Sequence, residues 1–134
     1  MNKKMKKGAI VFMNKGQCMN CHTGPHLTSF GFQNIGVPQI GPGVSGGDDK
    51  GRAEFTKAAG HNYMFRVPPI RNAALTAPYG HTGVFKNMWD LIEHYDHPMR
   101  NLRHFTWWNP QLPQYNQPLL PDPNVNNLNS RIRS

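Results

Sequence analysis

Apolar residues recur with helical spacing near the start of the chain. Over residues 3–15 they fall at i, i+3, i+4, i+7 and i+8, which predicts a helix with one apolar face. The residues on this face are Met5, Gly8, Ala9, Phe12 and Met13. The lysines of this stretch lie mostly off the face, and we expect the helix to stop at Gly16.

A second helix is predicted for residues 86–96, where apolar positions recur at i, i+3, i+4 and i+7. These positions are Met88, Leu91, Ile92 and Tyr95. Pro98 is expected to end the helix, because proline lacks an N–H donor and disfavours helix at the residue before it. Trp89 borders the apolar face, and we expect it in the core.

The remaining chain is predicted to be mostly irregular. Residues 23–50 are punctuated by Gly and Pro throughout and are expected to be loop. A short helix is predicted over residues 52–58, and residues 67–69 should be extended because they run into two prolines. Residues 109–134 hold five of the 12 prolines and six asparagines, which is typical of a linker or of a tail ordered by contacts.

Composition limits how much apolar core the chain can build for itself. Its 134 residues are enough for one domain, but only 37% are hydrophobic, and 13 Gly and 12 Pro take up much of the rest. The net charge is +8, with the basic residues scattered except at the N-terminus. No nucleic-acid motif is visible, so an acidic redox protein is the expected partner rather than nucleic acid. No run of 18 apolar residues exists that would predict a transmembrane segment.

The two cysteines of the chain form the motif that carries most chemical information. Cys18 and Cys21 are separated by two residues, and His22 follows at once, which is the C-x-x-C-H pattern of covalent haem c attachment. The cysteines would hold the haem, and His22 would be the proximal ligand of its iron. A zinc site, a redox-active dithiol and a small-loop disulfide are alternatives. The zinc site lacks a second pair of ligands, and the redox-active dithiol lacks a βαβ context. A disulfide between the two cysteines would leave His22 unexplained.

The second axial ligand of such an iron would decide its chemistry. The candidates are Met64, Tyr79, His81, His94, Tyr95, His97, Met99 and His104. Tyr95 lies on the apolar face of the second predicted helix, whereas His94 and His97 are rotated away from that face. Met99 would share the face only if the helix continued past Pro98, which is unfavourable.

Residues 65–83 read F-R-V-P-P-I-R-N-A-A-L-T-A-P-Y-G-H-T-G. This run resembles the C-terminal, electron-transfer haem domain of the bacterial di-haem cytochrome c peroxidase and MauG family. Upstream, the C-x-x-C-H-x-G-P stretch, the F-x-N-I-G-V run that begins at Phe32 and the D-x-G-R run that begins at Asp49 match the same family. The resemblance covers about residues 8–97.

This resemblance implies a mainly α, loop-rich, cytochrome c-like domain wrapped around one covalent haem c. In the family the C-terminal haem passes electrons to a peroxide-reacting haem in the other domain. Its distal ligand is Met in the peroxidases and Tyr in MauG-like proteins. The matching position here is Tyr95, with Met99 as the alternative.

Other site residues also follow from the resemblance. Arg66 and Arg71 are candidates for pairing with haem propionates or with another domain, since guanidinium matches carboxylate geometry. His81 is expected near the haem or as a cap of its own turn. The family binds calcium between its domains through backbone carbonyls that map to Thr76 and Pro78, and oxygen-only ligation suits calcium.

Only one C-x-x-C-H motif is present where the family has two. We expect residues 1–108 to form the haem domain and residues 109–134 to lead into a last helix that is missing. The leading hypothesis is an electron-transfer domain of a peroxide-reducing oxidoreductase. Its redox partner would be a second haem domain, an acidic protein or a small cytochrome or copper donor. The alternative is a stand-alone monohaem carrier, or a haem subunit of a larger assembly without its own catalysis.

The same motif bears on where the protein resides. Haem c is attached outside the bacterial cytoplasm, so a periplasmic or otherwise extracytoplasmic location is expected. The lysine-rich start resembles the n-region of a signal peptide, but the apolar stretch behind it is too short to continue one. We therefore expect the sequence to be a segment or a mature form.

Overall fold

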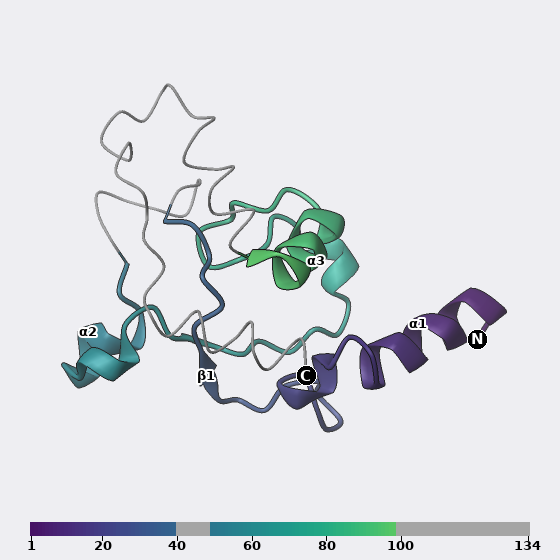
Figure 1. The fold of residues 1–134 in the computed structure, drawn as a ribbon, viewed down its shortest axis with the longest axis horizontal. Coiled ribbons are helices and arrows are strands. Elements are labelled where there is room, and N and C mark those ends of the chain that lie inside the picture. Colours follow the sequence, from purple (N-terminus) through teal and green to yellow (C-terminus); the bar gives the residue numbers. More distant parts are fainter. Residues whose placement is uncertain (40–48, 99–134) are drawn as a thin grey trace.

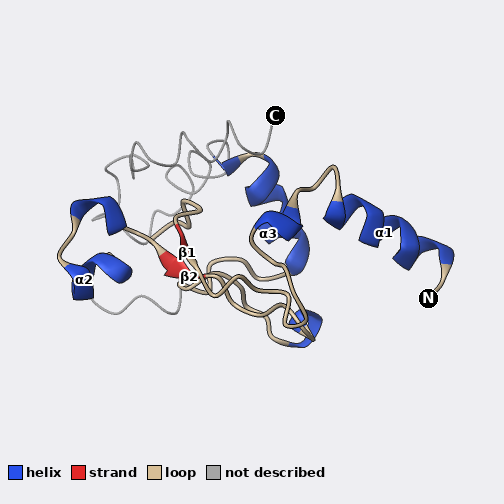
Figure 2. Ribbon diagram, turned by 90° about the horizontal axis from the view of Figure 1, so that it is seen from below, coloured by secondary structure: helices blue, strands red, loops and turns tan. Residues whose placement is uncertain are grey.

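The structure is a computed structural model that describes residues 1–39 and 49–98. The described chain contains three α-helices, three short 3₁₀ turns and a two-stranded sheet, joined by long loops (Figures 1 and 2). Their order is α1 Lys3–Met13, η1 Cys18–Asn20, β1 Phe32–Gln33, α2 Arg52–Thr56, η2 Ala59–His61, β2 Phe65–Arg66, η3 Ala73–Leu75 and α3 Met88–Asp96. The predicted tail of residues 109–134, together with Met99 and His104, lies outside the described residues.

Helix α1 confirms the first predicted helix but ends two residues earlier than predicted. Asn2 caps it, because its side-chain oxygen accepts a hydrogen bond from the Met5 N–H at 2.9 Å. The backbone leaves the helix at Asn14 rather than at Gly16. Gly16 still closes the end, since its N–H donates to the Val11 carbonyl at 2.7 Å. No residue of α1 is buried, and the helix projects from the rest of the fold (Figures 1 and 2).

One strand of the small sheet, β1, lies within residues 23–50, which were expected to be loop throughout. Strands β1 and β2 are antiparallel, with Phe32 opposite Arg66. Two residues are too few for an alternating pattern to stand out, so the sequence gives no warning of β1. Two arginines stack on the aromatic rings here, with Arg52 4.4 Å from the centre of Phe32 and Arg66 4.9 Å from that of Phe30.

Helix α2 confirms the predicted short helix and is one turn long. It ends where Lys57 adopts a left-handed conformation. It begins at Gly51, whose backbone (φ +57°, ψ −126°) suits glycine alone. A Cβ at Gly51 would lie 2.6 Å from the Met64 carbonyl oxygen, so the close approach of these two segments requires glycine.

Helix α3 confirms the second predicted helix, but its fully buried residue lies off the predicted apolar face, whose members Met88, Leu91 and Tyr95 are half-buried. The Asn87 side chain caps its start by accepting a hydrogen bond from the Asp90 N–H at 3.0 Å, and His97 forms its C-terminal end. Trp89 is 74% exposed, so its predicted place in the core is wrong. The fully buried residue of α3 is His94, at 0% exposure.

The core of apolar side chains is small, as the composition predicts. Among the described residues, the buried hydrophobic ones are Ala53, Val67 and Phe85. Several polar side chains are also buried: Thr28, Asn34, Gln39, Thr82 and His94. They connect loops by hydrogen bonds; for example, the Thr28 hydroxyl donates to the Val67 carbonyl at 2.6 Å. No helix within these residues is long and apolar enough to cross a membrane.

Candidate haem-binding site

The C-x-x-C-H motif is folded as one tight turn. The turn η1 starts after Gln17, which has a left-handed backbone, and the His22 N–H donates to the Cys18 carbonyl at 2.8 Å. Both cysteines are half-buried, and they are not disulfide-bonded to each other. Burial, more than the nearby Cys21, raises the pKa of the Cys18 thiol. A raised pKa is the opposite of what a thioredoxin-like nucleophile needs, so the redox-dithiol alternative is disfavoured.

His22 has one ring nitrogen committed and the other open. Its Nδ1 lies 3.1 Å from the Leu27 carbonyl oxygen. A carbonyl can only accept, so Nδ1 carries the hydrogen and Nε2 presents a lone pair. Metal-binding histidines are usually oriented in this way by a second hydrogen bond. The sequence does not reveal the role of Leu27, because any residue could supply this carbonyl.

The loop after the motif is bent so that it delivers this carbonyl. Leu27 has a left-handed backbone (φ +53°), which is costly for a residue with a branched side chain, and its N–H donates to the Gly24 carbonyl at 3.0 Å. The Thr28 N–H donates to the Thr23 carbonyl at 2.8 Å. These bonds hold residues 23–28 as a compact turn beside His22.

The structure brings Tyr95 of α3 to the motif from far along the chain. Burial, with smaller contributions from Cys21 and then Cys18, raises the pKa of the Tyr95 phenol to about 12. The phenol therefore lies close enough to both cysteine sulfurs to interact with them electrostatically. This proximity makes the Tyr95 phenol an available oxygen donor near the C-x-x-C-H turn.

The two histidines near Tyr95 are engaged elsewhere. The Nε2 of His94 lies 2.7 Å from the Ile35 carbonyl oxygen, and its Nδ1 is buried without a partner. Burial lowers the pKa of His94, against the opposing effect of the Ile35 bond, so the ring is neutral. His97 forms a 3.1 Å contact with the Asp96 carboxylate. Met99 and His104 lie beyond the described chain.

His81 belongs to a half-buried polar cluster around the buried Gln39, which the sequence did not reveal. The Gln39 side-chain oxygen accepts from the Asp49 N–H at 3.1 Å, which turns the Gln39 amide nitrogen toward His81 Nε2, also at 3.1 Å. Nε2 must accept this bond, so His81 is neutral. Its ring stacks on Phe65 with 3.5 Å between centroids. Burial lowers its pKa, and the Asp49 charge acts in the opposite direction.

The remaining predicted site residues lie at the surface. Arg66 is exposed over Phe30, and Arg71 is also exposed. Thr76 and Pro78 are exposed as well, and the Thr76 hydroxyl donates to the Ala73 carbonyl at 3.1 Å. Within residues 1–39 and 49–98, no group of three or more His, Cys, Asp or Glu side chains is arranged to hold a metal ion.

The structure also describes Tyr79 and Met64, the two other candidates for the second axial ligand. Tyr79 donates its hydroxyl to the Ala73 carbonyl at 2.7 Å, and Met64 is half-buried. The donor set around η1 therefore fits a covalent haem: two half-buried thiols, an imidazole with no hydrogen bond at Nε2 and the half-buried phenol of Tyr95 near them.

Comparison with known proteins agrees with the family resemblance seen in the sequence. No protein-family model matches the chain. It is 39% identical over 92 residues to a cytochrome c551 peroxidase of Pseudomonas aeruginosa, covering 68% of this chain and 25% of that protein. It is 28% identical over 92 residues to the methylamine utilization protein MauG of Methylorubrum extorquens, covering 67% of this chain and 24% of MauG. The chain thus spans about a quarter of the length of these relatives.

A solved structure resembles this fold. It is the crystal structure of a MauG-like protein associated with microbial copper homeostasis, with a TM-score of 0.62 and 25% sequence identity. The match covers 71% of this chain and 33% of that one. This likeness supports the predicted cytochrome c-like, loop-rich fold.

Proposed function

The chain belongs to the family of cytochrome c peroxidases and MauG, and we propose that it is an electron-transfer haem domain of such an oxidoreductase. These relatives imply a haem c cofactor, and the single C-x-x-C-H motif implies one haem for this chain. The observation that carries the proposal is the hydrogen bond from His22 Nδ1 to the Leu27 carbonyl, which leaves Nε2 for iron.

Each residue of the site has a defined task in this proposal. Cys18 and Cys21 would hold the haem through thioether bonds, and His22, oriented by the Leu27 carbonyl, would bind its iron. Tyr95 would supply a phenol oxygen as the second protein ligand. When bound, the haem provides an iron that accepts and donates one electron, and an anionic oxygen ligand favours the ferric state. The chain itself supplies burial, which keeps water from the phenol, and the bent loop that orients the imidazole.

The electrons would pass to a peroxide-reacting haem in another domain or another protein. The positive net charge of the chain suits an acidic donor that approaches by diffusion. Arg66 and Arg71 are exposed and available for propionates or for the second domain, and His81 remains a candidate neighbour of the haem. The carbonyls of Thr76 and Pro78 would contribute to calcium binding at that junction. Because haem c is attached outside the bacterial cytoplasm, an extracytoplasmic location is part of the proposal.

The test is to produce the chain together with the haem c attachment machinery and record its spectra. We expect a pyridine haemochrome of the c type and no turnover of hydrogen peroxide by this chain alone with a reduced donor. Rapid peroxide turnover would overturn the electron-transfer assignment in favour of a peroxidase. A protein that attaches no haem would overturn the whole proposal.

The distal ligand is tested by Tyr95→Phe. Removing the phenol oxygen should change the ferric absorption and EPR spectra. Tyr79→Phe is the matched control, because Tyr79 is also half-buried but donates its hydroxyl to the Ala73 carbonyl. Unchanged spectra in Tyr95→Phe would exclude ligation by Tyr95.

A further inference from the structure

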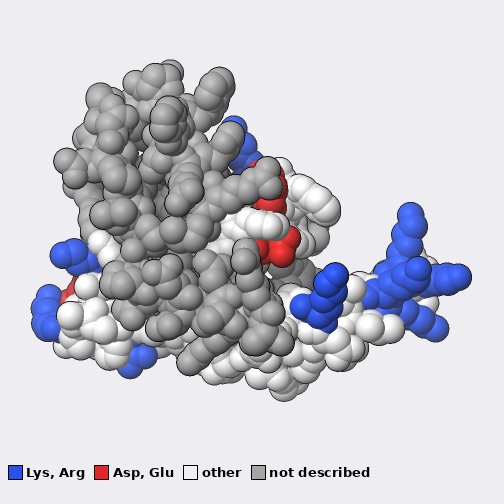
Figure 3. Space-filling view, viewed as in Figure 1, with Lys and Arg blue, Asp and Glu red and all other residues white. Residues whose placement is uncertain are grey.

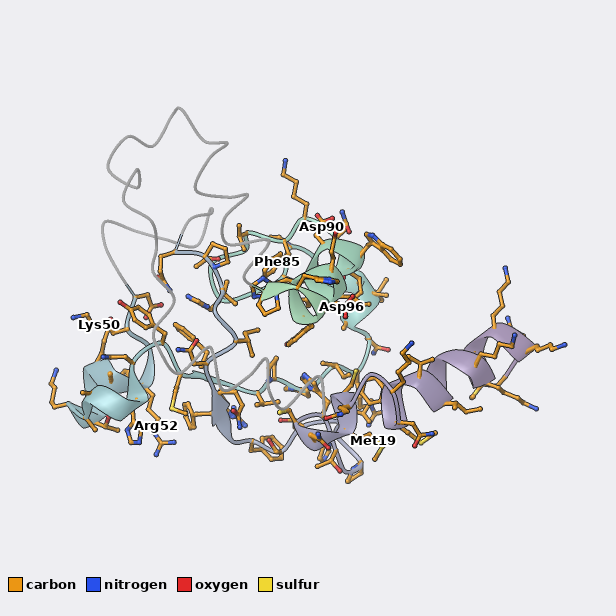
Figure 4. All side chains as sticks on the ribbon, in the orientation of Figure 1. Met19, Lys50, Arg52, Phe85, Asp90 and Asp96 are labelled. Atoms are coloured by element: carbon orange, nitrogen blue, oxygen red, sulfur yellow. The ribbon has the colours of Figure 1, made fainter. Side chains whose placement is uncertain are left out.

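Helix α3 is anchored by a polar residue rather than by an apolar one. His94 has no exposed surface, while its apolar neighbour Ile92 is 54% exposed. The His94 ring packs against Phe85, with 4.9 Å between centroids, and Phe85 is itself 1% exposed and lies next to α3 in Figure 4. His94 is therefore the residue through which α3 packs most deeply against the rest of the fold.

The buried His94 side chain makes one hydrogen bond to the rest of the fold. His94 Nε2 donates to the Ile35 carbonyl at 2.7 Å, across 59 residues of sequence. The acceptor belongs to a loop, and an apolar residue at position 94 would leave the carbonyl without this donor. Packing against Phe85 would by itself allow the helix some rotation about its axis, whereas a short hydrogen bond allows little.

The rotation of α3 determines where Tyr95 points. Successive residues on an α-helix are about 100° apart around its axis, so the direction of residue 94 sets the direction of residue 95. The Tyr95 phenol lies within electrostatic range of the two cysteine sulfurs, while the His94 ring contacts the Ile35 carbonyl and Phe85. The other polar anchor of the helix, the Asn87 cap, acts two turns away at its N-terminal end.

We propose that His94 is a positioning residue for Tyr95, because its bond to the Ile35 carbonyl sets the rotation of α3 that aims the phenol at the C-x-x-C-H turn. This inference rests on the proposed role of Tyr95 as distal ligand. His94 does not touch the reacting atoms, and it acts only through the helix that carries both residues.

The test compares three substitutions in the holoprotein. His94→Gln places an amide N–H near the position of Nε2 and can keep the bond to Ile35. His94→Asn is too short to reach that carbonyl, and His94→Leu has no donor. His97→Gln is the control, because His97 contacts Asp96 at the end of the same helix instead of the Ile35 loop. The readout is the tyrosinate signature of the ferric haem in EPR and resonance Raman spectra, with thermal unfolding recorded in parallel.

We expect His94→Gln and His97→Gln to keep the tyrosinate signature. His94→Asn and His94→Leu should lose it, or show it in only part of the protein. If His94→Leu does not fold, the comparison of Gln with Asn decides the question. A tyrosinate signature that persists in folded His94→Asn or His94→Leu would overturn the inference, as would its loss in His94→Gln.

The same samples separate this inference from the proposed function. Wild-type protein without attached haem would overturn the proposed function. Wild-type protein with haem c but no tyrosinate signature would overturn the role of Tyr95, and with it that of His94. Electron transfer by the haem would then still stand.

Discussion

Three histidines of this chain differ in the ring nitrogen that is engaged, or in whether that nitrogen donates or accepts the hydrogen bond. His22 donates through Nδ1 to Leu27, His94 donates through Nε2 to Ile35, and His81 accepts through Nε2 from Gln39. The partner of each ring thus decides whether the side chain can bind a metal, anchor a helix or stay neutral in a buried cluster. The motif identifies His22 from the sequence alone. The partners of the other two lie 42 and 59 residues away, so no local pattern reveals them.

His81 should make stability depend on pH. Burial lowers its pKa from the ordinary value of 6.5, so the unfolded chain binds a proton more readily than the folded one. The stability that His81 contributes is complete above about pH 6.5 and is lost as the pH falls through the lower folded pKa. We therefore expect the holoprotein to lose stability between pH 7.5 and pH 5, measured as a shift of the urea midpoint.

His81→Gln provides the comparison. The side-chain oxygen of the introduced glutamine can still accept the hydrogen bond from Gln39, but an amide does not titrate in this pH range. The variant should lose less stability than wild type over the same pH interval. Equal losses in both proteins would show that other groups cause the pH dependence.

Helices in this chain are recognisable from the sequence, but their partners are not. The apolar spacing located α1 and α3, because a repeat of 3.6 residues survives over two or three turns. The same spacing predicted Trp89 to lie in the core, but the structure shows it exposed. Spacing defines a face of a helix and does not say what covers that face. The sheet depends on the pairing of Phe32 with Arg66, and such distant pairing leaves no periodic mark in two residues.

The two asparagine caps offer a test of what each helix contributes. Asn87→Ala removes the bond to the Asp90 N–H and should lower the free energy of unfolding by about 1 kcal/mol, since α3 is anchored in the fold. Asn2→Ala removes the equivalent bond to the Met5 N–H of α1. No residue of α1 is buried, so its fraying should leave global unfolding almost unchanged.

Chemical denaturation of both variants, with helix content followed by circular dichroism, checks this prediction. A loss of similar size in both variants would mean that α1 unfolds together with the rest of the molecule. Asn87→Ala with wild-type stability would mean that the buried His94, rather than the cap, holds α3.

At the scale of the whole molecule, the described chain buries little apolar surface of its own. Ala53, Val67 and Phe85 are its buried hydrophobic residues, and loops make up much of the fold. Because hydrophobic burial is the main favourable contribution to folding, such a chain gains much from a large apolar cofactor. Composition predicts this shortage, since the Gly and Pro content is visible in the sequence.

Haem-free protein should therefore lack a cooperative thermal transition. We expect this result for the double variant Cys18→Ala/Cys21→Ala, and for wild-type chain produced without haem attachment. Calorimetry and near-ultraviolet circular dichroism, with the holoprotein as reference, provide the measurement. A sharp transition in either haem-free sample would show that the polypeptide folds without its cofactor.

Two helices of the described chain carry charges of opposite sign. Lys3, Lys4, Lys6 and Lys7 lie on the projecting α1, whereas Asp90, Glu93 and Asp96 lie on α3, and Figure 3 shows the basic end apart from the acidic patch. Helix α1 is thus positively charged, whereas the exposed side of α3 is acidic. A negatively charged surface would attract α1 and repel α3 before contact is made. An electrode of chosen sign would thus adsorb the protein in a chosen orientation, and the rate of electron exchange with that electrode would report the orientation.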